Sequence, residues 1–287
     1  MTGFGLPVRT GHHGTRTGPP TYEDTAMPTL HDDLGRTVTL VRRPTRIISL
    51  VPSLTEALVA TVPELLVGVT DYCTHTGDLD PPRVRGTKNP DHAAIRRLRP
   101  DLVIANREEN RRVDVDRLAQ AGIPVWVTEI DTLDQALDSF RRLFGDVLGV
   151  DQPAWMDDAR RAWMRPVELP GVRTLVPIWR DPWMAVGAGT FAGDLLRLIG
   201  LVNVLAEAPE RYPKRGLEEL QGLRPALVLL PDEPYPFSAI DGPEAFPGVA
   251  TALVSGRALT WYGPSLVTAR QELTHSVLAA LDGQDDR

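Results

Sequence analysis

The chain has 287 residues, 42% of them hydrophobic, and a formal net charge of -7 at pH 7. This length and apolar content can support one large domain or two modest lobes around a buried core. The acidic balance leaves no basic field that could gather phosphate backbones, so we expect no nucleic-acid partner. The single cysteine excludes an intrachain disulfide and a four-cysteine zinc cage.

The N-terminal stretch, residues 1–30, is expected to be a disordered tail. Its first 26 residues are rich in Gly, Thr, Pro and His and contain no apolar run that could form the core of a signal peptide. As written, the sequence therefore predicts a cytoplasmic protein, or an extracytoplasmic one if the true start differs, with Met27 as an alternative start. No run reaches the roughly 18 to 20 apolar residues of a membrane span, so we expect no transmembrane segment, and we expect a monomer.

From residue 31 onward, strand and helix patterns alternate. Residues 31–41 predict an edge hairpin, and residues 46–51 form a continuous apolar strand. A helix is expected to begin at Pro52, with Ser53 as its N-cap and Glu56 completing a capping box. Further strands are predicted at 66–69, 101–105 and 123–127, and further helices at 91–98, 112–121 and 133–148. This spacing indicates βαβ units and a mostly parallel sheet in an N-terminal lobe, residues 31–150.

The second half of the chain repeats two segments of the first. Residues 95–104 (IRRLRPDLVI) match residues 220–229 (LQGLRPALVL), and 50–52 match 175–177, both at a spacing of 125 residues. Two matches at one spacing predict a second, similar lobe over residues 170–287, joined to the first by a helix within 151–169. The alternative is that Arg-Pro-x-Leu-Val is merely a common way to end a helix and enter a buried strand.

Three runs together resemble a known family: RIISLVPSLTE at 46–56, VGVTDY at 67–72 and LRPDLVI at 98–104. They are similar to the helical-backbone (class III) periplasmic substrate-binding proteins of vitamin B12, haem and siderophore importers, and most similar to the vitamin B12-binding members. The resemblance covers residues 32–281. It implies an α/β fold with two lobes joined by a single long helix, and a ligand cleft between them. It also implies a non-enzymatic receptor that binds cobalamin, haem or a ferric siderophore and serves an ABC transporter permease.

Carried over by position, the resemblance implies a cleft lined from both lobes. Aromatic faces with a few polar groups suit a flat macrocycle or aromatic chelate. The expected ligand-binding residues are Tyr72, Cys73, His75, Asn106, Arg107 and Glu108 in the first lobe, and Trp179, Arg180, Trp183, Tyr212, Trp261 and Tyr262 in the second. For the tryptophans the alternative is packing under loops.

The acidic residues that dock such receptors onto their transporter match only in part. Glu218, or its neighbour Glu219, fits the second-lobe position, whereas Ala94 stands where the first-lobe acid is expected. Asp91 lies close by and could substitute. This departure leaves open a cytoplasmic metal or cofactor carrier on the same fold that does not dock to a transporter.

The stretch DYCTHTGD at 71–78 contains the single cysteine and a histidine two residues later. In an extended segment Cys73 and His75 would face the same way, so either could act as an axial ligand to cobalt or iron. A nucleophile and base pair is a less favoured reading, because no oxyanion-hole pattern accompanies it. We therefore expect no catalytic residues and no catalytic cofactor. The remaining reading is a buried thiol beside a solvated histidine.

Overall fold

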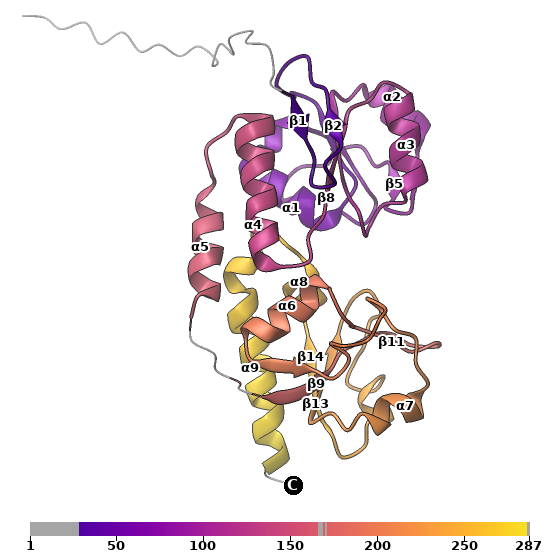
Figure 1. The fold of residues 1–287 in the computed structure, drawn as a ribbon, viewed down its shortest axis with the longest axis vertical. Coiled ribbons are helices and arrows are strands. Elements are labelled where there is room, and N and C mark those ends of the chain that lie inside the picture. Colours follow the sequence, from indigo (N-terminus) through magenta and orange to yellow (C-terminus); the bar gives the residue numbers. More distant parts are fainter. Residues whose placement is uncertain (1–28, 166–168, 170, 286–287) are drawn as a thin grey trace, which may run out of the picture.

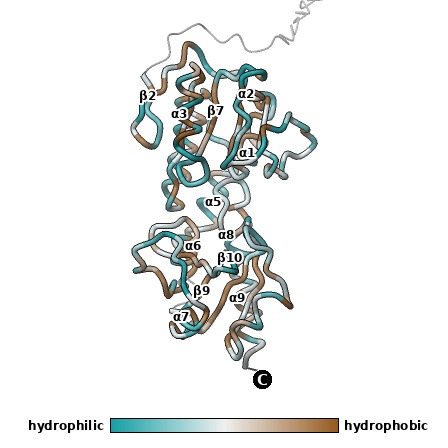
Figure 2. Tube along the Cα trace, turned by 90° about the vertical axis from the view of Figure 1, so that its right-hand side faces the viewer, coloured by the Kyte–Doolittle hydropathy of each residue, from teal (hydrophilic) through white to brown (hydrophobic). Residues whose placement is uncertain are grey.

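The computed structural model describes residues 29–165, 169 and 171–285. These residues form two α/β lobes that lie one above the other along the longest axis of the molecule (Figures 1 and 2). Each lobe is built on a four-stranded sheet whose strands all run parallel. The predicted fold class, two similar α/β lobes with mostly parallel sheets, is confirmed. The tail expected over 1–30 lies outside the described residues except for its last two positions, and Leu30 is already in a strand.

The sheet of lobe one has the strand order β4-β3-β7-β8. Its strands are β3 (Ile47–Ser49), β4 (Leu66–Val69), β7 (Leu102–Asn106) and β8 (Val125–Thr128). Both β7 and β8 are buried along their whole length, as expected for parallel strands covered on two faces. Two antiparallel hairpins accompany the sheet: β1 (Leu30–His31) with β2 (Thr37–Val38), and β5 (Arg85–Gly86) with β6 (Asn89–Pro90). The first is the hairpin predicted at 31–41.

The helices of lobe one follow the strands closely. They are α1 (Pro52–Thr61), the 3₁₀ turn η1 (Pro63–Leu65), α2 (His92–Leu98), α3 (Arg112–Gln120), α4 (Leu133–Arg141) and its π-helical continuation η2 (Arg142–Leu148). Asp91 and Thr132 cap α2 and α4, accepting backbone N–H groups at 2.9 and 3.1 Å. These short polar side chains satisfy helix N–H groups that have no partner within the helix.

The predicted cap of α1 is wrong. Helix α1 starts at Pro52 with Val51 in the cap position and no capping side chain. Proline at the first helical position supplies a suitable φ and has no N–H to satisfy. Ser53 therefore lies inside the first turn, and its hydroxyl is hydrogen-bonded to Tyr262 of lobe two. Glu56 pairs with Arg257 instead of folding back onto its own helix.

Lobe two repeats the architecture, with the strand order β12-β9-β13-β14. Its strands are β9 (Val172–Leu175), β12 (Leu201–Asn203), β13 (Leu227–Pro231) and β14 (Ala250–Val254), and a hairpin joins β10 (Pro177–Trp179) to β11 (Met184–Ala185). Its helices are α6 (Phe191–Leu198), α7 (Leu217–Gly222), the 3₁₀ turn η3 (Pro243–Ala245), α8 (Gly256–Thr260) and α9 (Leu266–Asp285). The Thr190 hydroxyl caps α6 by accepting the Gly193 N–H at 3.1 Å.

The sequence repeat corresponds to a structural repeat. Strands β7 and β13 begin 125 residues apart, at Leu102 and Leu227, and occupy the same place in their sheets. Just before each strand an arginine takes the same left-handed conformation: Arg99 and Arg224 both have a φ of 48°. Helix α2 ends one residue before Arg99 and α7 ends two residues before Arg224, and in both lobes the Arg-Pro pair then turns the chain into a buried strand.

Continuous apolar packing joins the lobes. The chain crosses from lobe one to lobe two through α5 (Ala154–Trp163), which lies beside α4 and α9 (Figure 1). One hydrophobic cluster includes Leu54 of α1, Phe144 of η2, Trp163 of α5 and Leu266 of α9. Separate clusters fill the other face of each sheet. A shared core of this kind limits relative movement of the lobes to small amplitudes. Within the described ranges, no helix is both long and apolar enough to cross a bilayer.

Candidate ligand-binding cleft

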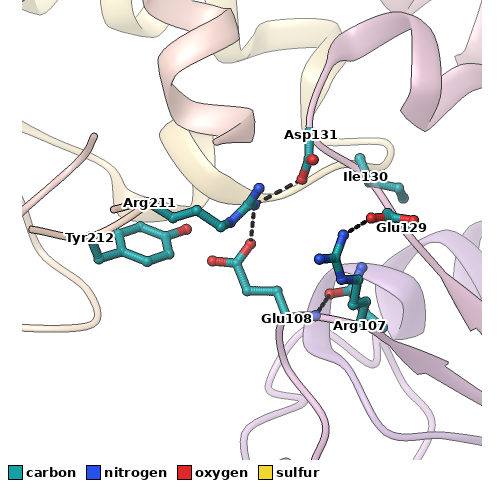
Figure 3. Close-up of a pocket in the computed structure, with 8 residues that line it drawn as sticks. Arg107, Glu108, Glu129, Ile130, Asp131, Arg211 and Tyr212 are labelled. Atoms are coloured by element: carbon teal, nitrogen blue, oxygen red, sulfur yellow. Dashed lines mark hydrogen bonds and ion pairs between the residues drawn. The ribbon is translucent and has the colours of Figure 1, made fainter. Parts of the chain in front are cut away.

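A cavity of about 280 Å³ lies between the lobes. Lobe one contributes the loops that follow β7 and β8, and lobe two contributes the segment before α7 (Figure 3). This is the carboxyl edge of a parallel sheet, where open α/β folds bind ligands. The lining residues are Asn106, Arg107, Glu108, Glu129, Ile130, Asp131, Arg211 and Tyr212.

Arg211 spans the cavity from lobe two. Its Nη2 donates to Glu108 Oε2 and to Asp131 Oδ1, both at 2.8 Å, while Nη1 contacts the carbonyl oxygen of Gly189 within lobe two. Each of the three charged side chains is about one-third exposed, at 35% for the arginine and 31% and 28% for the carboxylates. These hydrogen bonds outweigh burial and raise the pKa of Arg211. The guanidinium therefore links the lobes across the cavity.

The lobe-one side of the cavity has a second ion pair and a rigid base. Arg107 pairs with Glu129. Asn106 is 3% exposed, donates from Nδ2 to Thr128 at 3.1 Å and accepts the Glu108 N–H at 2.9 Å. Asn106 thus joins the ends of β7 and β8 and positions Glu108, which identifies it as a supporting residue more than a ligand contact.

Burial and negative charge dominate the electrostatics around the cavity. Burial, followed by the charge of Glu108 and a hydrogen bond to it, raises the pKa of Tyr212. Burial also raises the pKa of Glu109, against the opposing charge of Lys88. The pKa of Glu233 is raised mainly by burial, although a hydrogen bond with Trp261 lowers it. An acidic, partly desolvated environment therefore surrounds the bridging arginine.

A second polar contact between the lobes lies deeper. Glu56 of α1 pairs with Arg257 of α8, with 9% and 34% of their side chains exposed. Close to this pair Tyr262, 7% exposed, is hydrogen-bonded to Ser53. Gly263 approaches the backbone so closely that an added Cβ would lie 3.2 Å from the Ser53 carbonyl oxygen. The two lobes are therefore in close contact on this side of the cavity.

The predicted site residues fall into three groups. Asn106, Arg107, Glu108 and Tyr212 line the cavity. Outside the lining, Tyr72 is 65% exposed and Trp179 is 41% exposed. His75 is also exposed, and its ring makes an edge-to-face contact with Trp261 at 5.0 Å. Trp261 itself is 8% exposed.

The third group lies in the core or in other contacts. The Cys73 thiol is fully buried, 3.0 Å from the Thr55 hydroxyl, and Trp183 stacks on Phe237 inside lobe two. Tyr262 packs in the shared core, while Arg180 pairs with Asp241 and Glu244. Burial or competing partners thus keep these four residues from facing the cavity. For Cys73 the structure favours the buried-thiol reading; among the described residues no group of three or more His, Cys, Asp or Glu could hold a metal.

Four lining residues were not predicted: Glu129, Ile130, Asp131 and Arg211. The first three directly follow β8, a strand that the sequence did predict. The rule that open α/β sheets bind ligands at the carboxyl ends of their strands, applied to β8, would have found them. Arg211 precedes the predicted Tyr212, but nothing local indicates that its side chain crosses to the opposite lobe.

The chain thus combines two parallel sheets of matching strand order, one helical crossing between the lobes and a cavity at the strand ends. No family model matches the sequence. The chain is 23% identical over 259 residues to the vitamin B12-binding protein of Pectobacterium carotovorum, covering 84% of this chain and 91% of that protein. It is 26% identical over 190 residues to the vitamin B12-binding protein of Vibrio cholerae, covering 64% and 69%.

Solved structures have the same fold. The periplasmic vitamin B12-binding protein BtuF of Vibrio cholerae matches with a TM-score of 0.68 at 20% identity, over 83% of this chain and 98% of that one. The periplasmic haem-binding protein BhuT, solved with two haems, matches with a TM-score of 0.68 at 23% identity, over 82% and 98%. CeuE of Helicobacter pylori matches with a TM-score of 0.71 at 16% identity, over 89% and 90%. The resemblance inferred from the sequence is confirmed.

Proposed function

We propose that this protein is a substrate-binding receptor for a metal chelate, a corrinoid, a haem or a ferric siderophore, in an ABC-type uptake system. The observation that carries the proposal is the cavity at the carboxyl ends of β7 and β8, which Arg211 of lobe two closes. The vitamin B12-binding and haem-binding proteins named above support the ligand class. Because those relatives are binding proteins, we infer a receptor and not an enzyme.

A chelate enters this cleft only if the lobes separate. The cavity, at about 280 Å³, is just below the roughly 300 to 1,000 Å³ of typical ligand pockets. Opening would break the Arg211 bridge and uncover aromatic faces near the cleft. Tyr72 and Trp179, which are already exposed, would then offer surfaces for a macrocycle to stack on.

His75 is the candidate axial ligand to a bound metal. Its Nδ1 contacts the Thr74 hydroxyl at 3.1 Å, and its ring lies against Trp261. The second ring nitrogen has no partner in the part of the chain that the structure describes. An imidazole that is oriented by one nitrogen and free at the other can coordinate cobalt or iron.

Docking to a permease is supported in lobe two only. Glu218 lies exposed in the first turn of α7, where a cationic partner can reach it. In lobe one the first turn of α2 contains no acid, and the Asp91 carboxylate is used to cap that helix. This difference favours, as the second candidate, a cytoplasmic chelate carrier on the same fold that does not dock. Fractionation of the native protein distinguishes the two, since an exported protein contradicts the carrier.

A thermal-shift experiment tests the receptor proposal. Purified protein is mixed with cyanocobalamin, haemin or a ferric siderophore, and visible spectra are recorded in parallel. A ligand at 100 times its Kd adds roughly 2.7 kcal/mol, which raises Tm by about 4–5 °C for a chain of this size. His75→Ala should change the visible spectrum of the complex if the imidazole coordinates the metal. Absence of any shift with all three ligand classes refutes the receptor.

A further inference from the structure

The charges around the cavity point to selection of the ligand by its charge. We propose that the cleft accepts chelates with a neutral or cationic periphery and rejects anionic ones, and that Glu108 and Asp131 determine this specificity. The inference rests on the proposed receptor function and narrows its ligand class. The charge selection excludes chelates whose recognition depends on carboxylates at their periphery.

The cavity lining carries an excess of acid. Its three carboxylates, Glu108, Glu129 and Asp131, face two guanidinium groups, Arg107 and Arg211. Both guanidinium groups are already paired with those carboxylates: Arg107 with Glu129, and Arg211 with the other two (Figure 3). An incoming anion therefore finds no unpaired cation among the lining residues.

The groups behind the lining do not reverse this balance. The acids are Glu109, Asp232, Glu233 and Glu56, and the bases are Lys88 and Arg257. Arg257 is paired with Glu56, and the Lys88 ammonium is hydrogen-bonded to the backbone carbonyl of residue 108. The second layer thus also has more acids than bases, and its bases already have partners.

Opening of the cleft strengthens the selection. Arg211 is attached to lobe two through the Gly189 carbonyl, so it moves with that lobe. Glu108 and Asp131 stay on lobe one and lose the cation that bridges them at 2.8 Å. The open cleft then presents two unpaired carboxylates on lobe one against the single guanidinium of Arg211 on lobe two, so acid remains in excess. Amide N–H groups or cations on a chelate can replace the guanidinium, whereas peripheral carboxylates meet like charge.

Two ligand pairs, each with a shared macrocycle, test the proposal. Cyanocobalamin is compared with its monocarboxylic acid, in which one side-chain amide is replaced by a carboxylate, and haemin dimethyl ester with haemin. Dissociation constants are measured by fluorescence quenching or absorbance titration. The neutral member should bind more tightly by about fivefold per added carboxylate, the order expected for a charge roughly 8 Å away at an effective dielectric of about 40. The ratio should fall as salt is added.

Variants identify the residues responsible. The double substitution Glu108→Gln and Asp131→Asn should bring the two affinities in each pair together. Asp138→Asn is the matched control, because it removes one exposed carboxylate of α4 whose partner is Arg141, outside the cavity. Circular dichroism and Tm establish that the variants fold; if the double variant does not fold, each single substitution is measured instead.

The outcomes separate the two proposals. If no member of either pair binds and ferric siderophores give no thermal shift, the receptor function fails and the charge selection falls with it. If a chelate binds but its carboxylate form binds equally well or better, only the charge selection is overturned. An affinity ratio that is unchanged in the Glu108 and Asp131 variants also overturns it, because the preference would then arise elsewhere. If the affinity ratio changes by the same amount in Asp138→Asn as in the Glu108 and Asp131 variants, the charge selection is also overturned.

Discussion

The ion pair between Glu56 and Arg257 offers a sharp test of the contact between the lobes. Glu56 lies on α1 of lobe one with 9% of its side chain exposed, and Arg257 lies on α8 of lobe two with 34% exposed. In Arg257→Met the carboxylate stays buried without a cation, and its Oε2 already lacks a hydrogen-bond partner in the wild-type protein. Removing one partner of a fully buried pair costs about 3–5 kcal/mol. Since the arginine is one-third exposed, we expect Arg257→Met to lower the free energy of unfolding by a smaller amount, about 2–3 kcal/mol.

The reciprocal change should cost less. Glu56→Gln keeps the shape and leaves only a partly solvated arginine unpaired, so about 1 kcal/mol is expected. In the double variant neither charge is left alone, and the total loss should fall below the sum of the single losses by about 1–2 kcal/mol. The arginine substitution also removes a cation-π contact with Trp261 at 5.8 Å, so the arginine variant alone does not measure the ion pair.

The assay is equilibrium urea unfolding of the four proteins, followed by circular dichroism. The coupling energy is the difference between the double variant and the sum of the single variants. Arg141→Met is the control, because it removes an exposed pair with Asp138 on one helix and should cost less than about 0.5 kcal/mol. Strict additivity of the Glu56 and Arg257 substitutions would refute a direct pair between the lobes in solution.

Three further predictions follow from individual contacts. Burial alone would raise the pKa of Asp114, but hydrogen bonds from a neighbouring arginine and from His92 lower it overall; Asp114→Asn should therefore cost about 1–3 kcal/mol at pH 7, and the deficit in urea-unfolding free energy should shrink as the pH falls below about 4. Native Cys73 should react with a disulfide reagent about a hundredfold or more slowly than the unfolded chain, because the thiol is 0% exposed and burial raises its pKa; rapid modification without urea would contradict this. Gly187→Ala places a Cβ 2.4 Å from a backbone oxygen, so it should lower Tm and, by shifting the segment that carries Arg211, weaken chelate binding; unchanged titrations would show that this segment does not shape the cleft.

Sequence reasoning succeeded where the information is local. Apolar runs fixed the positions of β7 and β8, and the Arg-Pro repeat located equivalent helix ends at Arg99 and Arg224. The family resemblance placed Asn106, Arg107 and Glu108 in the cleft, and these residues line the cavity. The strand positions themselves need only the period of the apolar pattern.

Sequence reasoning failed where the same local pattern fits two different roles for a side chain. Ser53 followed by Glu56 is a typical capping box, yet the helix starts at Pro52, so Ser53 lies inside its first turn and both side chains instead contact lobe two. Trp183 and Cys73 were expected among the ligand-binding residues, but each is buried among residues of its own lobe. Nothing in a short window distinguishes an aromatic that covers a ligand from one that covers a core.

The sequence by itself determined the two-lobed parallel fold, its internal repeat and the edge of lobe one that forms the cavity. The period of the hydrophobic pattern and the residues that end helices and begin strands are local properties of the sequence, so they can be recognised without a structure. Only the tertiary structure decided that Arg211 of one lobe lies between Glu108 and Asp131 of the other, residues 103 and 80 positions away. That contact, and the excess of negative charge around it, depends on how the lobes pack, because charges distant in sequence act on one another only through their separation in space.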